Sequence, residues 1–184
     1  DNVPAEYTES LGKAMAEIHS ISAEKADAAG LKVEPADNLR IIMKERMSRV
    51  KENYPVHEKR WQRWENWLNQ ADMWPKKTGF IHGDLYPGHI LIDAESKVSG
   101  IIDWTEAKHA DVSNDFTAHY LLFGEDELVK LIKAYDKAGG YTWPKMKEHI
   151  IELLSTQAIT IAEFAETSGL EAYKQAAKDM LSQE

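Results

Sequence analysis

The chain is organised around one short stretch: Phe80-Ile81-His82-Gly83-Asp84-Leu85-Tyr86-Pro87-Gly88-His89-Ile90-Leu91-Ile92-Asp93, followed by Val98-Ser99-Gly100-Ile101-Ile102-Asp103-Trp104. Short apolar runs rich in β-branched residues bracket a polar loop that contains His82, Gly83 and Asp84. Between the last two runs, the five residues 93–97 are typical of a hairpin turn. The pattern therefore predicts three short strands, at about residues 79–82, 90–93 and 98–102.

Most of the remaining chain has the apolar periodicity of amphipathic helices. We expect helices at about residues 4–20, 37–50, 61–68, 114–123, 125–138, 144–165 and 170–182, with a polar loop at 105–113. Trp61, Trp64 and Trp67 recur at helical spacing, which favours core packing, although a stacking platform for a ligand stays open. We expect one predominantly helical α+β domain with a helical core part at 1–78, a catalytic hairpin at 79–104 and a second helical part at 105–184.

Composition excludes several classes of protein. The 184 residues contain 43% apolar and 29% charged residues and no Cys, so disulfides, Cys-based zinc sites and thiol catalysis are excluded. No apolar run of 18 residues and no secretory signal are visible, so we expect a cytoplasmic protein without a membrane partner. The formal net charge of −9 makes nucleic acid a poor partner.

Several well-known catalytic motifs are missing from the central stretch. Gly83 and Gly88 have the outer spacing of a phosphate-binding P-loop, but His89-Ile90 follows where a Lys and a Ser or Thr are needed. The chain has no G-x-G-x-x-G, H-E-x-x-H or G-x-S-x-G motif. A P-loop, a zinc protease and a serine hydrolase are therefore rejected.

The remaining candidates for chemistry are carboxylates and imidazoles at strand ends. Pairing of the last two predicted strands would bring His89 and Asp103 to the same end of the hairpin. Carboxylate oxygen suits Mg²⁺, and imidazole is a softer and less usual ligand for that ion. Asp84 needs no metal, so it is free to orient a hydroxyl nucleophile, and the set suits phosphoryl transfer. Each residue alone is also compatible with an ordinary turn role.

The motifs resemble those of a known family. His82-Gly83-Asp84, with His89 five residues further on, and Ile101-Ile102-Asp103-Trp104 are similar to the paired motifs of the aminoglycoside phosphotransferase family of antibiotic kinases, which has a protein-kinase-like fold. Longer local matches at residues 72–79, 85–89, 102–107 and 143–153 resemble the macrolide 2′-phosphotransferases. The resemblance extends over nearly the whole chain.

The resemblance implies roles for individual residues. Asp84 is expected to be the catalytic base that orients the macrolide 2′-hydroxyl. His89, which replaces the family's usual Asn, and Asp103 are expected to bind Mg²⁺. Asp115 is expected to brace the catalytic loop through backbone N–H groups, and His82 to pack against and fix that loop. The expected phosphate donor is GTP, with ATP as the alternative.

The resemblance also implies a missing part and a substrate pocket. The family's N-terminal lobe, which carries a phosphate-holding Lys, has no counterpart in this chain, and the chain starts at Asp1 rather than at a Met. We therefore expect a C-terminal lobe that binds macrolide but has little or no activity without its partner lobe. The expected lining of the macrolide pocket is Leu85, Tyr120, Phe123, Ile159, Ala162, Glu163 and Phe164.

Two alternatives stay open. The same fold could phosphorylate another small hydroxyl compound, such as an aminoglycoside, choline or homoserine. The chain could also be a non-catalytic module that binds a small molecule.

Overall fold

The computed structural model describes residues 3–183, and its elements are mostly helical. In chain order they are α1 (Ala5–His19), α2 (Ala23–Ala28), α3 (Ala36–Asn53), α4 (Glu58–Asn69), η1 (Ala71–Met73), β1 (Gly79–Ile81), η2 (Pro87–His89), β2 (Ile90–Ile92), β3 (Val98–Ile101), β4 (Lys108–Ala110), α5 (Asn114–Lys137), α6 (Met146–Ser155), α7 (Gln157–Ser168) and α8 (Glu171–Ser182). The predicted helix-rich α+β class, with a small strand layer in the middle of the chain, is confirmed.

The strands form two antiparallel pairs. β2 and β3 make the predicted hairpin, with Ile90 opposite Ile101 and an irregularity after Leu91. β1 pairs instead with β4, where Gly79 lies opposite Ala110. The prediction of a polar loop throughout residues 105–113 was therefore wrong. The segment Lys108–Ala110 has no alternating apolar pattern, and its strand partner lies far away in the sequence.

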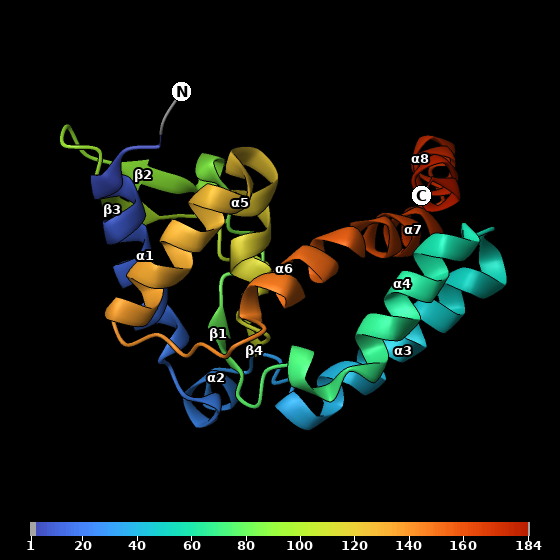
Figure 1. Cartoon of the computed structure of the whole chain (residues 1–184), viewed down its shortest axis with the longest axis horizontal. Coiled ribbons are helices and arrows are strands. Elements are labelled where there is room, and N and C mark those ends of the chain that lie inside the picture. Colours follow the sequence, from blue (N-terminus) through green and yellow to red (C-terminus); the bar gives the residue numbers. More distant parts are fainter. Residues whose placement is uncertain (1–2, 184) are drawn as a thin grey trace.

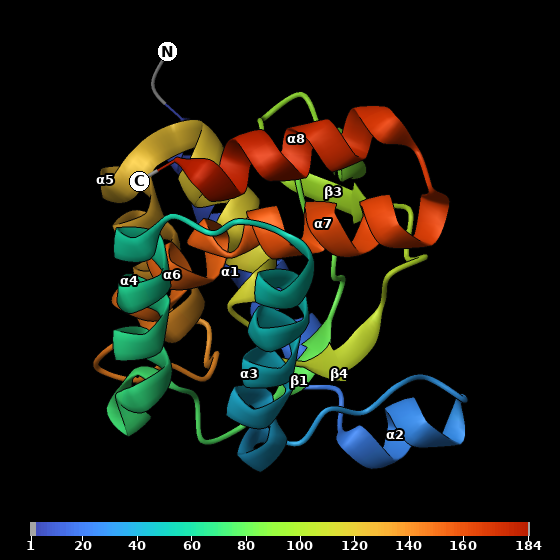
Figure 2. The same ribbon diagram turned by 90° about the vertical axis from the view of Figure 1, so that its right-hand side faces the viewer.

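Two hydrophobic cores organise the helices. The first core joins α1, β1, α5 and the start of α6, and the second joins α3, α4, α7 and α8. Figure 1 shows the first group around the strands and the second group at the other end of the molecule, and Figure 2 shows α7 and α8 lying over α3 and α4. Helix α6 connects them, because Met146 and Ile150 belong to the first core while Leu153 packs against the second.

The Trp-rich helix supplies anchors of the second core. Trp64 and Trp67 of α4 are buried, and the Trp67 ring stacks on Trp74 with a distance of 4.5 Å between ring centroids. Burial of these rings favours core packing over a ligand platform. Trp61 is partly buried and packs against the same core.

Two long helices are interrupted. α5 is broken at Gly124, whose φ of 83° and ψ of −177° are not helical, which agrees with the two helices predicted for this region. The single helix predicted for about residues 144–165 is instead divided into α6 and α7 at Thr156. Within residues 3–183, none of the helices combines the length and the apolar character that crossing a bilayer requires.

Candidate active site

The loop after β1 is held by a buried carboxylate. The backbone N–H of His82 donates to Asp115 Oδ2 over 2.8 Å, and the N–H of Gly83 donates to Oδ1 over 2.9 Å. Asp115 is buried in the first turn of α5. Gly83 has a φ of 86°, and a side chain there would collide with the carbonyl oxygen of Glu106 at 2.4 Å. The loop therefore has one tightly defined backbone path.

His82 ties this loop to the segment before Asp103. Its Nδ1 accepts the backbone N–H of Asp84 over 3.2 Å, so the neutral ring carries its proton on Nε2. That Nε2 lies 2.9 Å from the carbonyl oxygen of Ile102, to which it donates. Because both ring nitrogens are engaged and the side chain is fully buried, His82 is placed to fix the loop rather than to transfer protons.

Asp84, His89 and Asp103 lie together at the base of the β2–β3 hairpin. His89 Nδ1 is 2.9 Å from the carbonyl oxygen of Asp84 and 3.7 Å from its Oδ2. Since a carbonyl oxygen only accepts, the proton of a neutral His89 ring belongs on Nδ1, and Nε2 carries the free lone pair. That Nε2 is 3.6 Å from Asp103 Oδ2. The side chains of Asp84 and Asp103 are 60% and 54% exposed, so both are accessible to ligands.

The environment of Asp103 favours its ionised form. The Thr105 hydroxyl donates to Asp103 Oδ1 over 2.5 Å, and this bond, with a contribution from nearby His89, holds the pKa of the carboxyl below its usual value. The backbone of Asp103 has a φ of 62°, which is unusual for a residue other than glycine. A charged carboxylate in a special backbone conformation is typical of a functional position.

His89 and Asp103 could hold a metal ion that also binds water or phosphate oxygens. His89 Nε2 and Asp103 Oδ2 are one nitrogen and one oxygen facing each other. In the part of the chain that the structure describes, no group of three or more His, Asp or Glu side chains is arranged to enclose a metal. A divalent cation such as Mg²⁺ commonly retains water and phosphate oxygens beside one or two protein ligands. The two donors of this site are compatible with that mode of binding.

Three of the residues predicted to line a substrate pocket are core residues. Ile159 and Ala162 are fully buried in the second core, and Leu85 is buried in the first. Their side chains therefore offer no surface to a ligand, and the pocket prediction was wrong for these three positions. Helical periodicity places a residue on an apolar face but does not distinguish a core face from the wall of a pocket.

Glu163, the acidic residue among those predicted to line the pocket, has cationic partners within the chain. The Arg46 guanidinium donates to both of its carboxylate oxygens, the shorter distance being 2.7 Å, and Arg49 adds a bond of 3.1 Å. Burial by itself raises the pKa of Glu163, but the two Arg side chains more than offset this and the pKa is lowered. The side chain joins α7 to α3.

The other predicted pocket residues keep exposed surface. Tyr120 and Phe123 of α5 are half-buried, and Phe164 of α7 is 49% exposed. The Phe123 ring packs on His119, with centroids 4.9 Å apart, and the Phe164 ring packs edge-on against Tyr173, with centroids 4.6 Å apart. These three side chains remain candidates for contact with an apolar ligand.

The sequence reasoning missed residues behind the loop. His19, the last residue of α1, places Nε2 3.1 Å from Asp115 Oδ2. Its other ring nitrogen lies 2.9 Å from the hydroxyl of Tyr135. Both residues carry only weak signals, since a His at a helix end and a Tyr on an apolar face are common in any core.

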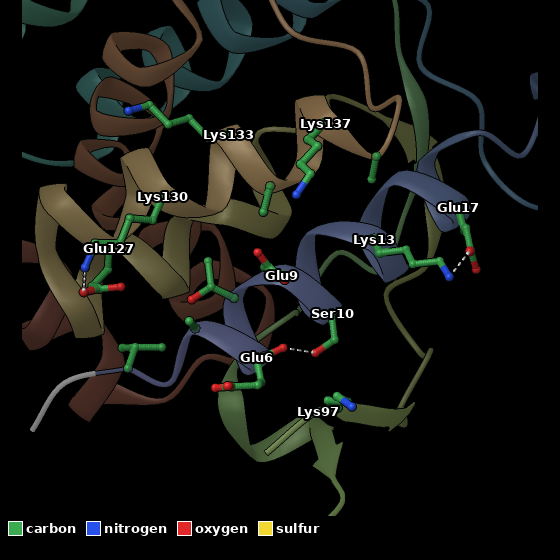
Figure 3. Close-up of a pocket in the computed structure, with 15 residues that line it drawn as sticks. Glu6, Glu9, Ser10, Lys13, Glu17, Lys97, Glu127, Lys130, Lys133 and Lys137 are labelled. Atoms are coloured by element: carbon green, nitrogen blue, oxygen red, sulfur yellow. Dashed lines mark hydrogen bonds and ion pairs between the residues drawn. The ribbon is translucent and has the colours of Figure 1, made fainter. Parts of the chain in front are cut away.

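A surface groove lies apart from this site. It runs between α1 and the second half of α5 and has a volume of about 810 Å³. Figure 3 shows Glu6 and Glu9 of α1 on one wall and Lys130 and Lys137 of α5 on the other. None of the residues predicted for catalysis, metal binding or substrate contact lines this groove.

The site combines a loop held by a buried carboxylate with a hairpin that ends in a second carboxylate, an arrangement compatible with the phosphoryl transfer of kinase-like enzymes. Comparison with known proteins agrees. The family described as "Phosphotransferase enzyme family" matches residues 1–149, and the chain belongs to this family. The predicted relationship to the antibiotic kinases, and with it the predicted fold class, is confirmed.

The most informative relatives are macrolide kinases. A protein described as macrolide 2′-phosphotransferase type I superposes with a TM-score of 0.93 at 39% identity, over 98% of this chain and 61% of its own. Macrolide 2′-phosphotransferase MphH from Brachybacterium faecium superposes with a TM-score of 0.92 at 28% identity, over 99% and 62%. The GDP complex of an aminoglycoside 2′-phosphotransferase shares the fold, with a TM-score of 0.74 at 17% identity.

The chain is shorter than these relatives. The Bacillus subtilis protein YcbJ, of uncharacterised function, is 38% identical over 160 residues, which are 87% of this chain and 52% of YcbJ. The chain thus spans about half of YcbJ and about three fifths of the macrolide kinases.

Proposed function

We propose that this chain is the catalytic and substrate-binding C-terminal lobe of a macrolide 2′-phosphotransferase. The longer enzyme transfers the γ-phosphate of GTP, with ATP as the alternative donor, to the 2′-hydroxyl of a macrolide amino sugar. One observation carries the proposal: accessible Asp84 and Asp103 face the two nitrogens of His89 on a fold shared with macrolide kinases. An accessible carboxylate beside a cation-binding pair is what phosphoryl transfer needs.

Asp84 is the catalytic residue in this proposal. Asp115 fixes the backbone next to Asp84, because its carboxylate accepts hydrogen bonds from the N–H groups of His82 and Gly83. The Asp84 side chain itself is exposed, so its carboxylate can accept a hydrogen bond from a bound hydroxyl. It orients the attacking oxygen and takes its proton as the new O–P bond forms, while the bond from the γ-phosphorus to the bridging oxygen breaks and the nucleoside diphosphate leaves.

His89 and Asp103 are the proposed metal-binding pair. In its neutral form the His89 ring offers a lone pair on Nε2, and the Thr105 hydrogen bond favours the ionised form of Asp103. A Mg²⁺ ion held there would neutralise charge on the donor phosphates.

The proposed partner is an N-terminal lobe that clamps the nucleotide. The relatives are longer than this chain, and the chain carries no P-loop or other glycine-rich phosphate motif. Several apolar side chains on and beside the β2–β3 hairpin are exposed, which supports a covering partner: Leu91, Ile92, Ile102 and Trp104. The isolated chain is then a macrolide-binding lobe with little or no turnover, in a protein of the cytoplasm.

A kinase for aminoglycosides, choline or homoserine is the runner-up. An aminoglycoside carries several ammonium groups and needs several free carboxylates in its pocket. Glu163, the acidic candidate on α7, is instead paired with Arg46 and Arg49. This observation favours an apolar antibiotic over a polycation.

The first test uses the longer enzyme that contains this chain. Asp84→Asn should lower the rate of macrolide phosphorylation by about 10²–10⁴-fold, because the variant cannot accept the proton. Asp72→Asn, at an exposed position in η1, is the matched control and should leave the rate unchanged. Nearly full activity of Asp84→Asn would refute the role of Asp84, and no transfer to macrolides by the unmodified enzyme would refute the substrate.

The second test measures binding to the 184-residue chain by calorimetry. We expect heat on titration with an erythromycin-like macrolide and none with GTP and Mg²⁺. Tight nucleotide binding by this chain alone would contradict the proposed need for a partner lobe, and no macrolide binding would favour another acceptor.

A further inference from the structure

A buried line of hydrogen bonds runs from the candidate catalytic loop to the far end of α5. Asp115 accepts from the loop and also lies 3.1 Å from Nε2 of His19. Nδ1 of His19 in turn lies 2.9 Å from the hydroxyl of Tyr135. All three side chains are buried. The line connects the first turn of α5, the end of α1 and the last turns of α5.

The direction of each hydrogen bond follows from its partners. Three N–H groups converge on Asp115, from His82, Gly83 and His19, so the carboxylate acts as the common acceptor. His19 must then carry a proton on Nε2, and in the neutral ring Nδ1 is an acceptor. Burial raises the pKa of the Tyr135 hydroxyl, so the hydroxyl stays protonated and donates a hydrogen bond to Nδ1.

The Tyr135 ring has almost no freedom to move. A Cβ on Gly140 would lie 2.4 Å from a Tyr135 ring carbon, and a Cβ on Gly12 would lie 2.7 Å from the Tyr135 backbone nitrogen. The Phe116 ring also packs edge-on against the Tyr135 ring, at 86° and with centroids 5.2 Å apart. One glycine thus lies against the ring and another against the backbone of Tyr135, so the position of this residue is tightly defined.

We propose that Tyr135 is a positioning residue for the loop that carries Asp84, acting through His19 and Asp115. Tyr135 fixes the tautomer of His19, His19 orients the Asp115 carboxylate, and Asp115 sets the backbone of His82 and Gly83. Such polarised chains strengthen each member beyond its pairwise contribution. The structural part of this inference stands on these contacts alone, and only its effect on catalysis rests on the proposed function.

The first test compares two Tyr→Phe variants of the 184-residue chain. Tyr135→Phe removes the terminal hydroxyl and keeps the ring. Tyr7→Phe is the matched control, since Tyr7 lies in the same core and stacks on His119, and within residues 3–183 its hydroxyl has no hydrogen bond. Urea unfolding of both variants measures the change in overall stability.

The readout is amide hydrogen exchange at His82 and Gly83, followed by NMR. In Tyr135→Phe, these two amides should exchange about fivefold to tenfold faster than the change in overall stability explains, because the carboxylate that they bind is less well held. Tyr7→Phe should show no such excess. Equal exchange in the two variants would overturn the proposal and leave His19 and Tyr135 as satisfied core residues.

A second arm uses the longer enzyme and separates orientation from folding. Tyr135→Phe should lower kcat about fivefold with little change in the KM for the acceptor. Binding of the acceptor substrate is unaffected, while the Asp84 carboxylate is less well positioned for the reaction. His19→Gln, whose amide can both donate and accept, should keep more activity than His19→Leu. Equal kcat in the two His19 variants would contradict a role for this line of hydrogen bonds. An inactive unmodified enzyme would refute the proposed function and leave the exchange result to decide.

Discussion

At the level of single residues, Asp103 combines two unusual properties. Its carboxylate is hydrogen-bonded to Thr105 and faces His89, while its backbone has a positive φ of 62°. A left-handed conformation costs a residue with a Cβ roughly 1–2 kcal/mol relative to glycine. Asp and Asn tolerate it better than most residues, so the position accepts a carboxylate at a limited cost.

Two substitutions separate the backbone from the charge. Asp103→Gly should raise the free energy of unfolding by about 0.5–1 kcal/mol, because glycine adopts this φ without strain. Asp103→Asn should change it by less than about 0.5 kcal/mol. In the longer enzyme with bound nucleotide, both variants should lose affinity for Mg²⁺ or Mn²⁺ in calorimetric titration, since the ionised oxygen is gone. A glycine variant that is less stable than the Asn variant would contradict backbone strain at Asp103.

Among the elements, α5 carries the clearest constraint. Gly124 has a φ of 83° with a ψ of −177°, a combination that is essentially confined to glycine. No atom lies within 4 Å of the place that a Cβ would take, so crowding plays no part. The break separates the turns that contain Asp115 and Tyr120 from the turns that contain Tyr135. The direction of the second half of α5 therefore depends on one backbone conformation.

Substitution of two glycines tests this dependence. Gly124→Ala should lower the free energy of unfolding by about 2–3 kcal/mol. Gly169→Ala is the control, because Gly169 has a φ of 69° and a ψ of 6° and also has open space around its Cβ position. That left-handed conformation is accessible to alanine at about 1 kcal/mol. Urea unfolding compares the two, and an equal loss would mean that the helix break does not require glycine.

The elements differ in how far the sequence predicts them. The β2–β3 hairpin was predictable because its turn and its two apolar runs are neighbours in the chain. The same hairpin places His89 beside Asp103, so that part of the site followed from local pairing. β4 was missed because its strand character comes from a distant partner, β1. The bond between His19 and Tyr135 joins residues 116 positions apart, which no local pattern reveals.

At the scale of the whole molecule, one buried chain of contacts joins the two cores. Trp67 of α4 donates its indole N–H to His149 Nδ1 over 3.1 Å. His149 of α6 places Nε2 2.7 Å from Asp111 Oδ2, just before α5. Burial alone would raise the pKa of Asp111, but His149 and the N–H of Ser113 outweigh it, and the pKa is lowered.

This pairing makes stability depend on pH in the acid range. Because the folded state lowers the pKa of Asp111 below its ordinary 3.8, the carboxylate stabilises the fold above about pH 4. That contribution is lost as the pH falls through the folded-state value. Asp111→Asn should be about 1–3 kcal/mol less stable at pH 7 and should lose less stability between about pH 4 and pH 2. Urea unfolding at each pH, followed by tryptophan fluorescence, measures both slopes, and parallel slopes would refute the assignment.

The apolar residues on and beside the β2–β3 hairpin have a practical consequence for purification. Four of these side chains are exposed on a chain of formal charge −9: Leu91, Ile92, Ile102 and Trp104. Mutual repulsion keeps such molecules apart in dilute buffer, whereas salt shortens its range to about 8–10 Å near physiological ionic strength. Contacts between these exposed apolar side chains then favour association of copies. Ionic strength, more than temperature, should decide whether this polypeptide stays monodisperse during concentration and storage.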